Sequence, residues 1–106
     1  MFREQNQNKR VLSLAEIKNV VKPVADQYHV EAVYLFGSYA RGEAHGESDL
    51  DFLVYGGPHF KLTKILSIGG ILSESFQKNV DAFEIREVDE NSDFYRTIMK
   101  EKVQVA

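Results

Sequence analysis

The sequence contains no cysteine, which excludes disulfide bonds, thiolate zinc sites and a cysteine nucleophile. This composition fits a reducing compartment, so we expect a cytoplasmic protein. No apolar run approaches the roughly 18 residues of a membrane span, and the first ten residues, MFREQNQNKR, have no apolar core like that of a secretion signal. We therefore expect no membrane partner.

An excess of positive charge is also missing. The chain carries 13 lysines and arginines against 16 aspartates and glutamates, which gives a formal net charge of −3. Proteins that bind nucleic acid by neutralising phosphates are usually basic, so this balance argues against nucleic acid as the main partner. The length of 106 residues is enough for one domain with one core. We predict that residues 11–106 form this domain, after a polar and flexible lead-in over 1–10.

Hydrophobic patterning predicts an α/β (α+β) fold with a small mixed sheet flanked by helices. The predicted helices span 14–28, 60–77 and a short segment after Ser92, and the predicted strands span 31–36, 49–55, 80–85 and 103–105. Ser13 and Glu16 have the spacing of a helix capping box, and Pro23 should bend the first helix. The acidic stretch 84–93 is expected to be a solvated connection.

The pair Asp49 and Asp51 is the first candidate for chemistry. Two aspartates at i and i+2 on a strand point to the same face, with Cβ atoms about 6–7 Å apart. Two carboxylates held this close repel each other unless a cation lies between them, and such hard oxygen ligands suit Mg²⁺. The alternative is a solvated strand end, where the aspartates cap the preceding turn.

Two further features place a phosphate site and a third carboxylate near this pair. Gly37 and Ser38 follow the first strand, where glycine allows close approach of a ligand and the serine begins a helical turn that favours an anion. Taken alone, this pair is more often only a turn. Asp81 begins the third strand, although it is equally expected as a polar residue at a strand edge. All these residues meet only if strand one is antiparallel to strand two and strand three is parallel to it. The connections permit this, because a helix lies between strands two and three.

These motifs resemble those of a known family. The segment Gly37-Ser-Tyr-Ala-Arg41-Gly42, the segment Ser48-Asp-Leu-Asp-Phe-Leu-Val54 and the pair Val80-Asp81 are similar to the minimal nucleotidyltransferases (MNT proteins) of the DNA polymerase β superfamily. Members of this family are commonly encoded beside HEPN-type partners as antitoxins. The resemblance covers most of the chain and implies a polymerase β-like nucleotidyltransferase fold.

The resemblance also implies a role for each matching residue. Gly37 and Ser38 would hold the β and γ phosphates of ATP, the nucleotide donor, while Asp49 and Asp51 would bind two Mg²⁺ ions. Asp81 would bind the second ion and help to deprotonate the attacking hydroxyl. Arg41 would meet a phosphate or, equally, tie its loop to a nearby carboxylate. Ser48 is expected to be a turn residue, and Tyr39 a residue that covers the helix.

Three hypotheses for the function follow. The first, which we favour, is Mg²⁺-dependent transfer of AMP from ATP to a hydroxyl, a tyrosine of a HEPN-type toxin, which makes the protein an antitoxin. The second is a non-catalytic antitoxin or adaptor that neutralises its partner by contact. The third is a structural domain that Mg²⁺ stabilises without nucleotide chemistry.

Overall fold

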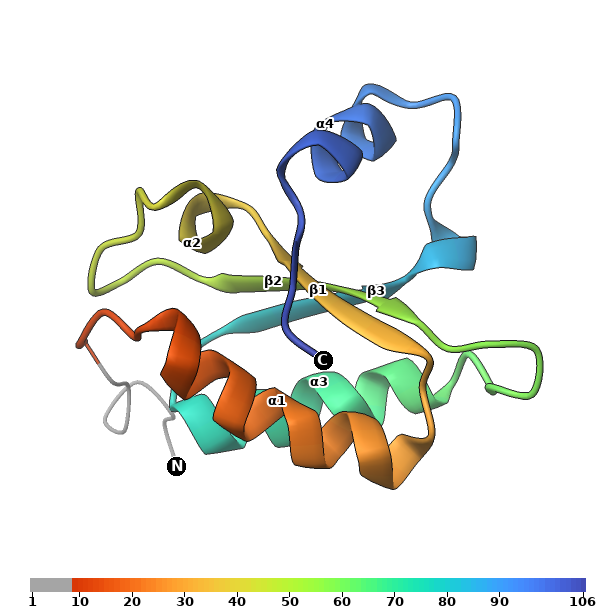
Figure 1. The fold of residues 1–106 in the computed structure, drawn as a ribbon, viewed down its shortest axis with the longest axis horizontal. Coiled ribbons are helices and arrows are strands. Elements are labelled where there is room, and N and C mark those ends of the chain that lie inside the picture. Colours follow the sequence, from red (N-terminus) through yellow and green to blue (C-terminus); the bar gives the residue numbers. More distant parts are fainter. Residues whose placement is uncertain (1–8) are drawn as a thin grey trace.

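The computed structural model describes residues 9–106 and shows a four-stranded sheet with helices on its two faces (Figure 1). In chain order, the elements are α1 (Leu14–Tyr28), β1 (Ala32–Phe36), α2 (Ser38–Arg41), β2 (Leu50–Tyr55), α3 (Lys64–Phe76), β3 (Val80–Glu84), the 3₁₀ turn η2 (Ile85–Glu87), α4 (Asp93–Glu101) and β4 (Val103–Gln104). Within residues 9–106, no helix has the length and apolar character needed to cross a membrane.

The sheet has the strand directions on which the predicted site depends. Its order is β3-β2-β1-β4, with β1 antiparallel to β2 and β2 parallel to β3. The helix α3 lies in the crossover between the two parallel strands, as a parallel connection requires. The predicted strand pairing is therefore confirmed, and β4 closes the sheet antiparallel to β1.

Helices α1 and α3 cover one face of the sheet and form the larger core (Figure 1). The predicted capping box at the start of α1 is present, because the Ser13 side chain accepts from the Glu16 N–H and the Glu16 side chain accepts from the Ser13 N–H. The helix runs on through Pro23 as one element. Alternate residues of β2 point into this core: Leu50, Phe52 and Val54.

Helix α4 covers the other face, over a smaller core that is rich in aromatic residues. Leu53 of β2 packs there with Phe36 and Ile98, and Phe83 of β3 packs against them. Ser92 is the N-cap of α4, as predicted, and its hydroxyl accepts from the Tyr95 N–H. The β2 residues between those of the larger core, such as Leu53, thus face α4.

The structure differs from the sequence-based expectations at the ends of two segments. Residues 1–8 of the predicted lead-in lie outside the described residues, whereas Lys9 and Arg10 form ion pairs with Glu47 and Glu16. The helix predicted over 60–77 begins later, at Lys64, after turns in the preceding residues.

The prediction of a solvated connection over 84–93 was wrong at its first residue, Glu84. Its side chain is 1% exposed and accepts hydrogen bonds from the Gly56 N–H and from the backbone and side chain of Arg86. Burial raises the pKa of Glu84, but these hydrogen bonds outweigh burial and keep the pKa below its usual range. The sequence gives no sign that this glutamate is turned inward.

Candidate active site

The turn at Gly37 lies against Asp51. Residue Phe36 at the end of β1 is paired with Asp51 of β2, so the chain turns at Gly37 directly beside that carboxylate. Gly37 has φ +78° and ψ −157°, a conformation that is nearly restricted to glycine. A Cβ atom at this position would overlap Asp51 Oδ2. The glycine is therefore needed for both its backbone conformation and its contact with Asp51.

The second and third carboxylates come from the neighbouring positions of the sheet. Asp51 is paired with Asp81 across the parallel strands β2 and β3, and Asp49 directly precedes β2. Asp51 alternates with Phe52 and so shares the α4 face with Leu53, while Asp81 shares that face with Phe83. The three predicted aspartates thus lie at one end of the sheet, beside the Gly37 turn.

Asp51 is the carboxyl whose environment is most unusual. It is half-buried, and burial together with the negative charges of Asp81, Asp49 and Glu101 raises its pKa to about 6, with Arg41 acting in the opposite direction. Burial is the largest cause of this shift, and the neighbouring carboxylates add to it by disfavouring the ionised form of Asp51. A bound cation would remove this penalty.

The chemistry of this donor set fits a hard divalent cation, because carboxylate oxygens are the ligands that Mg²⁺ prefers. The side chains of Asp51 and its strand partner Asp81 could hold such an ion, together with Asp49. As they stand, the side chains of residues 9–106 bring no three histidines, aspartates or glutamates together into a group that could hold a metal ion. Metal binding at these three residues therefore stays a prediction.

Arg41 ties its loop to two carboxylates. Its Nε donates to Glu43 Oε1 at 2.9 Å, and its Nη1 lies 3.2 Å from each oxygen of Glu101. The interaction between the side chains of Arg41 and Glu101 joins the end of α2 to the end of α4. Of the two roles expected for Arg41, the structure shows the tie to nearby carboxylates, and phosphate binding stays a prediction.

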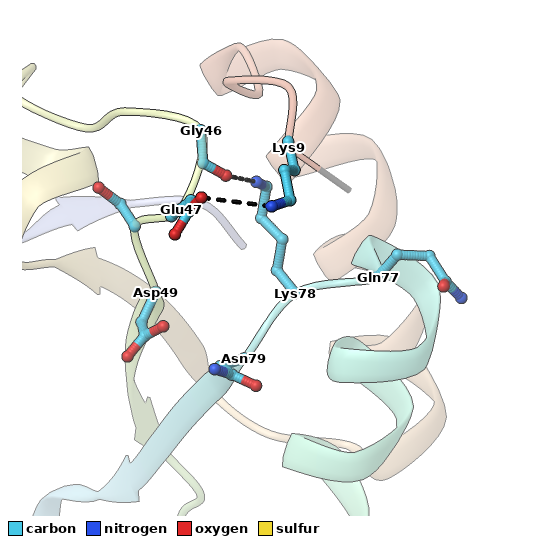
Figure 2. A pocket seen from close by; sticks show the side chains of 8 residues that line it. Lys9, Gly46, Glu47, Asp49, Gln77, Lys78 and Asn79 are labelled. Atoms are coloured by element: carbon cyan, nitrogen blue, oxygen red, sulfur yellow. Dashed lines mark hydrogen bonds and ion pairs between the residues drawn. The ribbon is translucent and has the colours of Figure 1, made fainter. Parts of the chain in front are cut away.

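The loop that leads from α2 to Asp49 is held by two lysines. Figure 2 shows the narrow pocket between this loop and the end of α3, with Asp49 and Asn79 along its wall. Lys78, which is 5% exposed, donates from Nζ to the Gly46 carbonyl at 2.8 Å, and Lys9 Nζ lies 3.3 Å from Glu47 Oε2. These contacts fix the loop immediately before Asp49.

The remaining polar residues of this region have the structural roles that were expected. The Ser48 hydroxyl accepts from the His45 N–H at 2.9 Å within the loop turn. The Tyr39 hydroxyl accepts from the Leu12 N–H at 3.3 Å, and its ring packs against the larger core. Sequence reasoning missed Glu101, which contacts the Gly37 turn from α4, and Lys78, which contacts the loop before Asp49 from the segment between α3 and β3.

With this geometry established, comparison with known proteins decides the family. The model of the family described as "Polymerase beta, Nucleotidyltransferase" matches residues 17–106, nearly the whole described chain. This chain belongs to the polymerase beta nucleotidyltransferase family. It is an enzyme of the nucleotidyltransferase class by this membership, and the predicted fold is confirmed.

Two relatives with similar sequences are named as protein adenylyltransferases, one of them as a candidate. The protein adenylyltransferase MntA of Thermococcus cleftensis is 29% identical over 99 residues, which cover 90% of this chain and 98% of that protein. A shorter match, 48% identical, is to a protein of Methanocaldococcus jannaschii named as a candidate protein adenylyltransferase. It covers 40% of this chain and spans 46% of that relative.

Solved structures share the fold. A toxin–antitoxin structure with AMP-PNP has a TM-score of 0.72 at 20% identity, over 84% of this chain and 72% of that one. The structure of a tri-AMPylated Shewanella oneidensis HEPN toxin in complex with an MNT antitoxin has a TM-score of 0.68 at 16% identity, over 89% and 72%. At these identities, the likeness is one of fold.

Proposed function

We propose that this chain is a Mg²⁺-dependent protein adenylyltransferase of the cytoplasm that transfers AMP from ATP to a tyrosine hydroxyl of a HEPN-type toxin. By this modification it acts as an antitoxin. The observation that carries the proposal is the position of Asp49, Asp51 and Asp81 at one end of the sheet, beside the Gly37 turn. The names of the relatives, among them a protein adenylyltransferase and an MNT antitoxin bound to an AMPylated HEPN toxin, support it.

In the proposed reaction, some residues bind the nucleotide and another accepts a proton. The backbone and hydroxyl of Ser38, directly after the Gly37 turn, hold the β and γ phosphates, and the turn brings them next to Asp51. The hydroxyl oxygen of the acceptor attacks the α-phosphorus of ATP, the bond from that phosphorus to the bridging oxygen breaks, and pyrophosphate leaves. Asp81, which is exposed at the edge strand, accepts the hydroxyl proton.

Asp49 and Asp51 would hold the divalent ions, with Asp81 as the third ligand. When bound, Mg²⁺ supplies polarisation of the α-phosphate and neutralises charge on the attacking and leaving oxygens. The half-buried Asp51 has the most to gain, because a cation replaces the repulsion that it experiences from its neighbours.

The proposal is tested by incubating the chain with ATP, Mg²⁺ and a HEPN-type toxin, and by measuring the intact mass of that toxin. We expect one or more added AMP units on the partner, mapped to tyrosine by peptide sequencing. The double variant Asp49→Asn, Asp51→Asn should add none. Asp26→Asn, an exposed aspartate of α1 away from the site, is the matched control and should transfer as the unmodified chain does.

The same variants separate transfer from simple contact. If the double variant folds, transfers nothing and still neutralises the partner in cells, then contact alone suffices and the enzymatic account of the antitoxin is wrong. Retained AMP transfer by the double variant would contradict the mechanism itself. No transfer by the unmodified chain, with ATP, Mg²⁺ and the partner all present, would overturn the proposed activity.

A further inference from the structure

Glu101 has a contact pattern that the proposed reaction does not explain. Its carboxylate Oε2 accepts a hydrogen bond from the Gly37 N–H at 2.5 Å, although the two residues are 64 positions apart in the chain. Both of its oxygens also lie 3.2 Å from Arg41 Nη1. One side chain therefore contacts the residue before α2 and the residue at its end.

Local helix physics disfavours a carboxylate at this position. Glu101 is the last residue of α4, where the negative end of the helix dipole repels an acidic side chain. Its side chain is only 14% exposed, so its charge is also partly removed from water. A carboxylate in such a place needs partners to compensate, and Gly37 and Arg41 are the partners that the structure provides.

The contact bears on the conformation of Gly37. A backbone in this sparsely populated region persists only where the surroundings hold it, and each restraint on it matters. On one side the turn lies against Asp51, and from α4 the Glu101 carboxylate fixes its N–H. The guanidinium of Arg41 pairs with the Glu101 carboxylate. The negative charge of Glu101 therefore repels an incoming triphosphate less than an unpaired carboxylate would.

We propose that Glu101 is a positioning residue for nucleotide binding: it clamps the Gly37 turn and Arg41 from α4 and so sets the affinity for ATP. This inference rests on the proposed function for the identity of the nucleotide. The clamp acts through the contacts of Glu101 with Gly37 and Arg41. Its loss should weaken ATP binding and leave the chemical step largely unchanged.

The chain offers a matched control for this test. Glu43 also pairs with Arg41, at 2.9 Å, but its side chain is 65% exposed and its oxygen accepts from the guanidinium of Arg41, not from the Gly37 turn. Glu101→Ala removes the acceptor for Gly37, Glu101→Gln keeps an oxygen that can accept from its N–H, and Glu43→Ala removes only a partner of Arg41. The three variants separate the contact with the turn from the contact with the arginine.

Three measurements decide the inference. Calorimetric titration with ATP and Mg²⁺ should give a Kd about tenfold or more higher for Glu101→Ala, partial recovery for Glu101→Gln and no change for Glu43→Ala. In the transfer assay, Glu101→Ala should raise KM for ATP with kcat within about threefold. Hydrogen exchange of the Gly37 amide, followed by NMR, should be accelerated in Glu101→Ala and unchanged in Glu43→Ala.

The outcomes distinguish this inference from the proposed function. An unchanged Kd in a folded Glu101→Ala variant, or an equal rise in Glu43→Ala, would overturn the clamp. A lower Kd would also overturn it, because the carboxylate would then compete with phosphate. If the unmodified chain binds ATP but modifies no partner, the proposed function fails while the Kd series still decides the role of Glu101. If it binds no ATP, both fail.

Discussion

The two faces of the sheet differ in what they contribute. The face under α1 and α3 is a closed apolar core, and its β2 residues Leu50, Phe52 and Val54 are fully buried. The face under α4 has a smaller core, and at one end of it the charges of Asp49, Asp81 and Glu101 act on Asp51, beside the Gly37 turn. Strand β2 thus contributes apolar side chains to the larger core on one face and the Asp51 carboxylate at the end of the other face, because successive side chains of a strand point to opposite faces. Stability and chemistry can therefore be changed separately in adjacent residues.

The largest expected effect is on activity, from Asp51→Asn on the α4 face. Loss of an ion ligand should lower the transfer rate by about 10²–10⁴-fold, since metal stabilisation of the transition state is worth several kcal/mol. The variant should nevertheless fold at least as well as the unmodified chain, because the amide carries no charge beside Asp49 and Asp81. Transfer assays and denaturant unfolding on the same preparation check both parts. A variant that is both inactive and destabilised would contradict the separation of the two faces.

Phe52→Ala, at the next residue of β2 on the other face, should lower stability and leave ATP binding unchanged. Phe52 is fully buried and stacks with Phe76 of α3, with ring centroids 6.2 Å apart. Removing the ring should cost about 3–5 kcal/mol of unfolding free energy through lost burial and a cavity. Urea unfolding measures the loss. Where the variant stays folded, its Kd for ATP should match that of the unmodified chain, and a specific loss of ATP binding would show that this face also shapes the site.

Gly37→Ala should affect stability and ATP binding together. Its Cβ would overlap Asp51 Oδ2 and its φ is positive, so we expect a loss of about 1–3 kcal/mol in stability together with loss of ATP binding. Gly42→Ala is the matched control, because Gly42 also has a positive φ, +74°, but within residues 9–106 an added Cβ would meet nothing within 4 Å beyond its chain neighbours. It should cost stability alone. Equal effects of the two changes on ATP binding would mean that contact with Asp51 is not needed.

The smallest expected effect is a dependence of stability on pH. The pKa of Asp51 is raised to about 6 in the folded state, against about 3.9 in an unfolded chain. As pH falls from 7 to 5, the folded state takes up this proton first, so the unfolding free energy should rise. Because Asp51 is only half-buried, solvent screens the effect, and we expect about 1 kcal/mol.

Thermal unfolding at pH 7, 6 and 5 measures this dependence. A gain of about 1 kcal/mol corresponds to a rise of about 4–8 °C in Tm for a domain of this size. Asp51→Asn cannot take up the proton, so the difference in Tm between it and the unmodified chain should shrink as the pH falls. Parallel pH curves for the two proteins would show that neither burial nor the neighbouring carboxylates raise the pKa of Asp51 in the free protein.

Much of the fold could be predicted because its signals are local. The capping box at Ser13, the helical spacing behind it and the Ser92 cap depend on residues within a few positions, and each is present in the structure. The strand directions were also predictable, since a helix between two strands favours a parallel crossover and a short loop favours an antiparallel pair. The position of Asp81 beside Asp51 follows from these directions.

The sequence alone was enough to predict the main helices and strands and the pairing of β2 with β1 and β3, but not the place of β4 beside β1 or the turn η2. Only the tertiary structure decided how the buried charges are partnered. Glu84 turns inward to bind Gly56 and Arg86, and Glu101 reaches the Gly37 turn from a helix at the far end of the chain. Helix periodicity and caps depend on residues that are close together in the sequence. A carboxylate, by contrast, is buried where segments far apart in the sequence supply its hydrogen-bond donors.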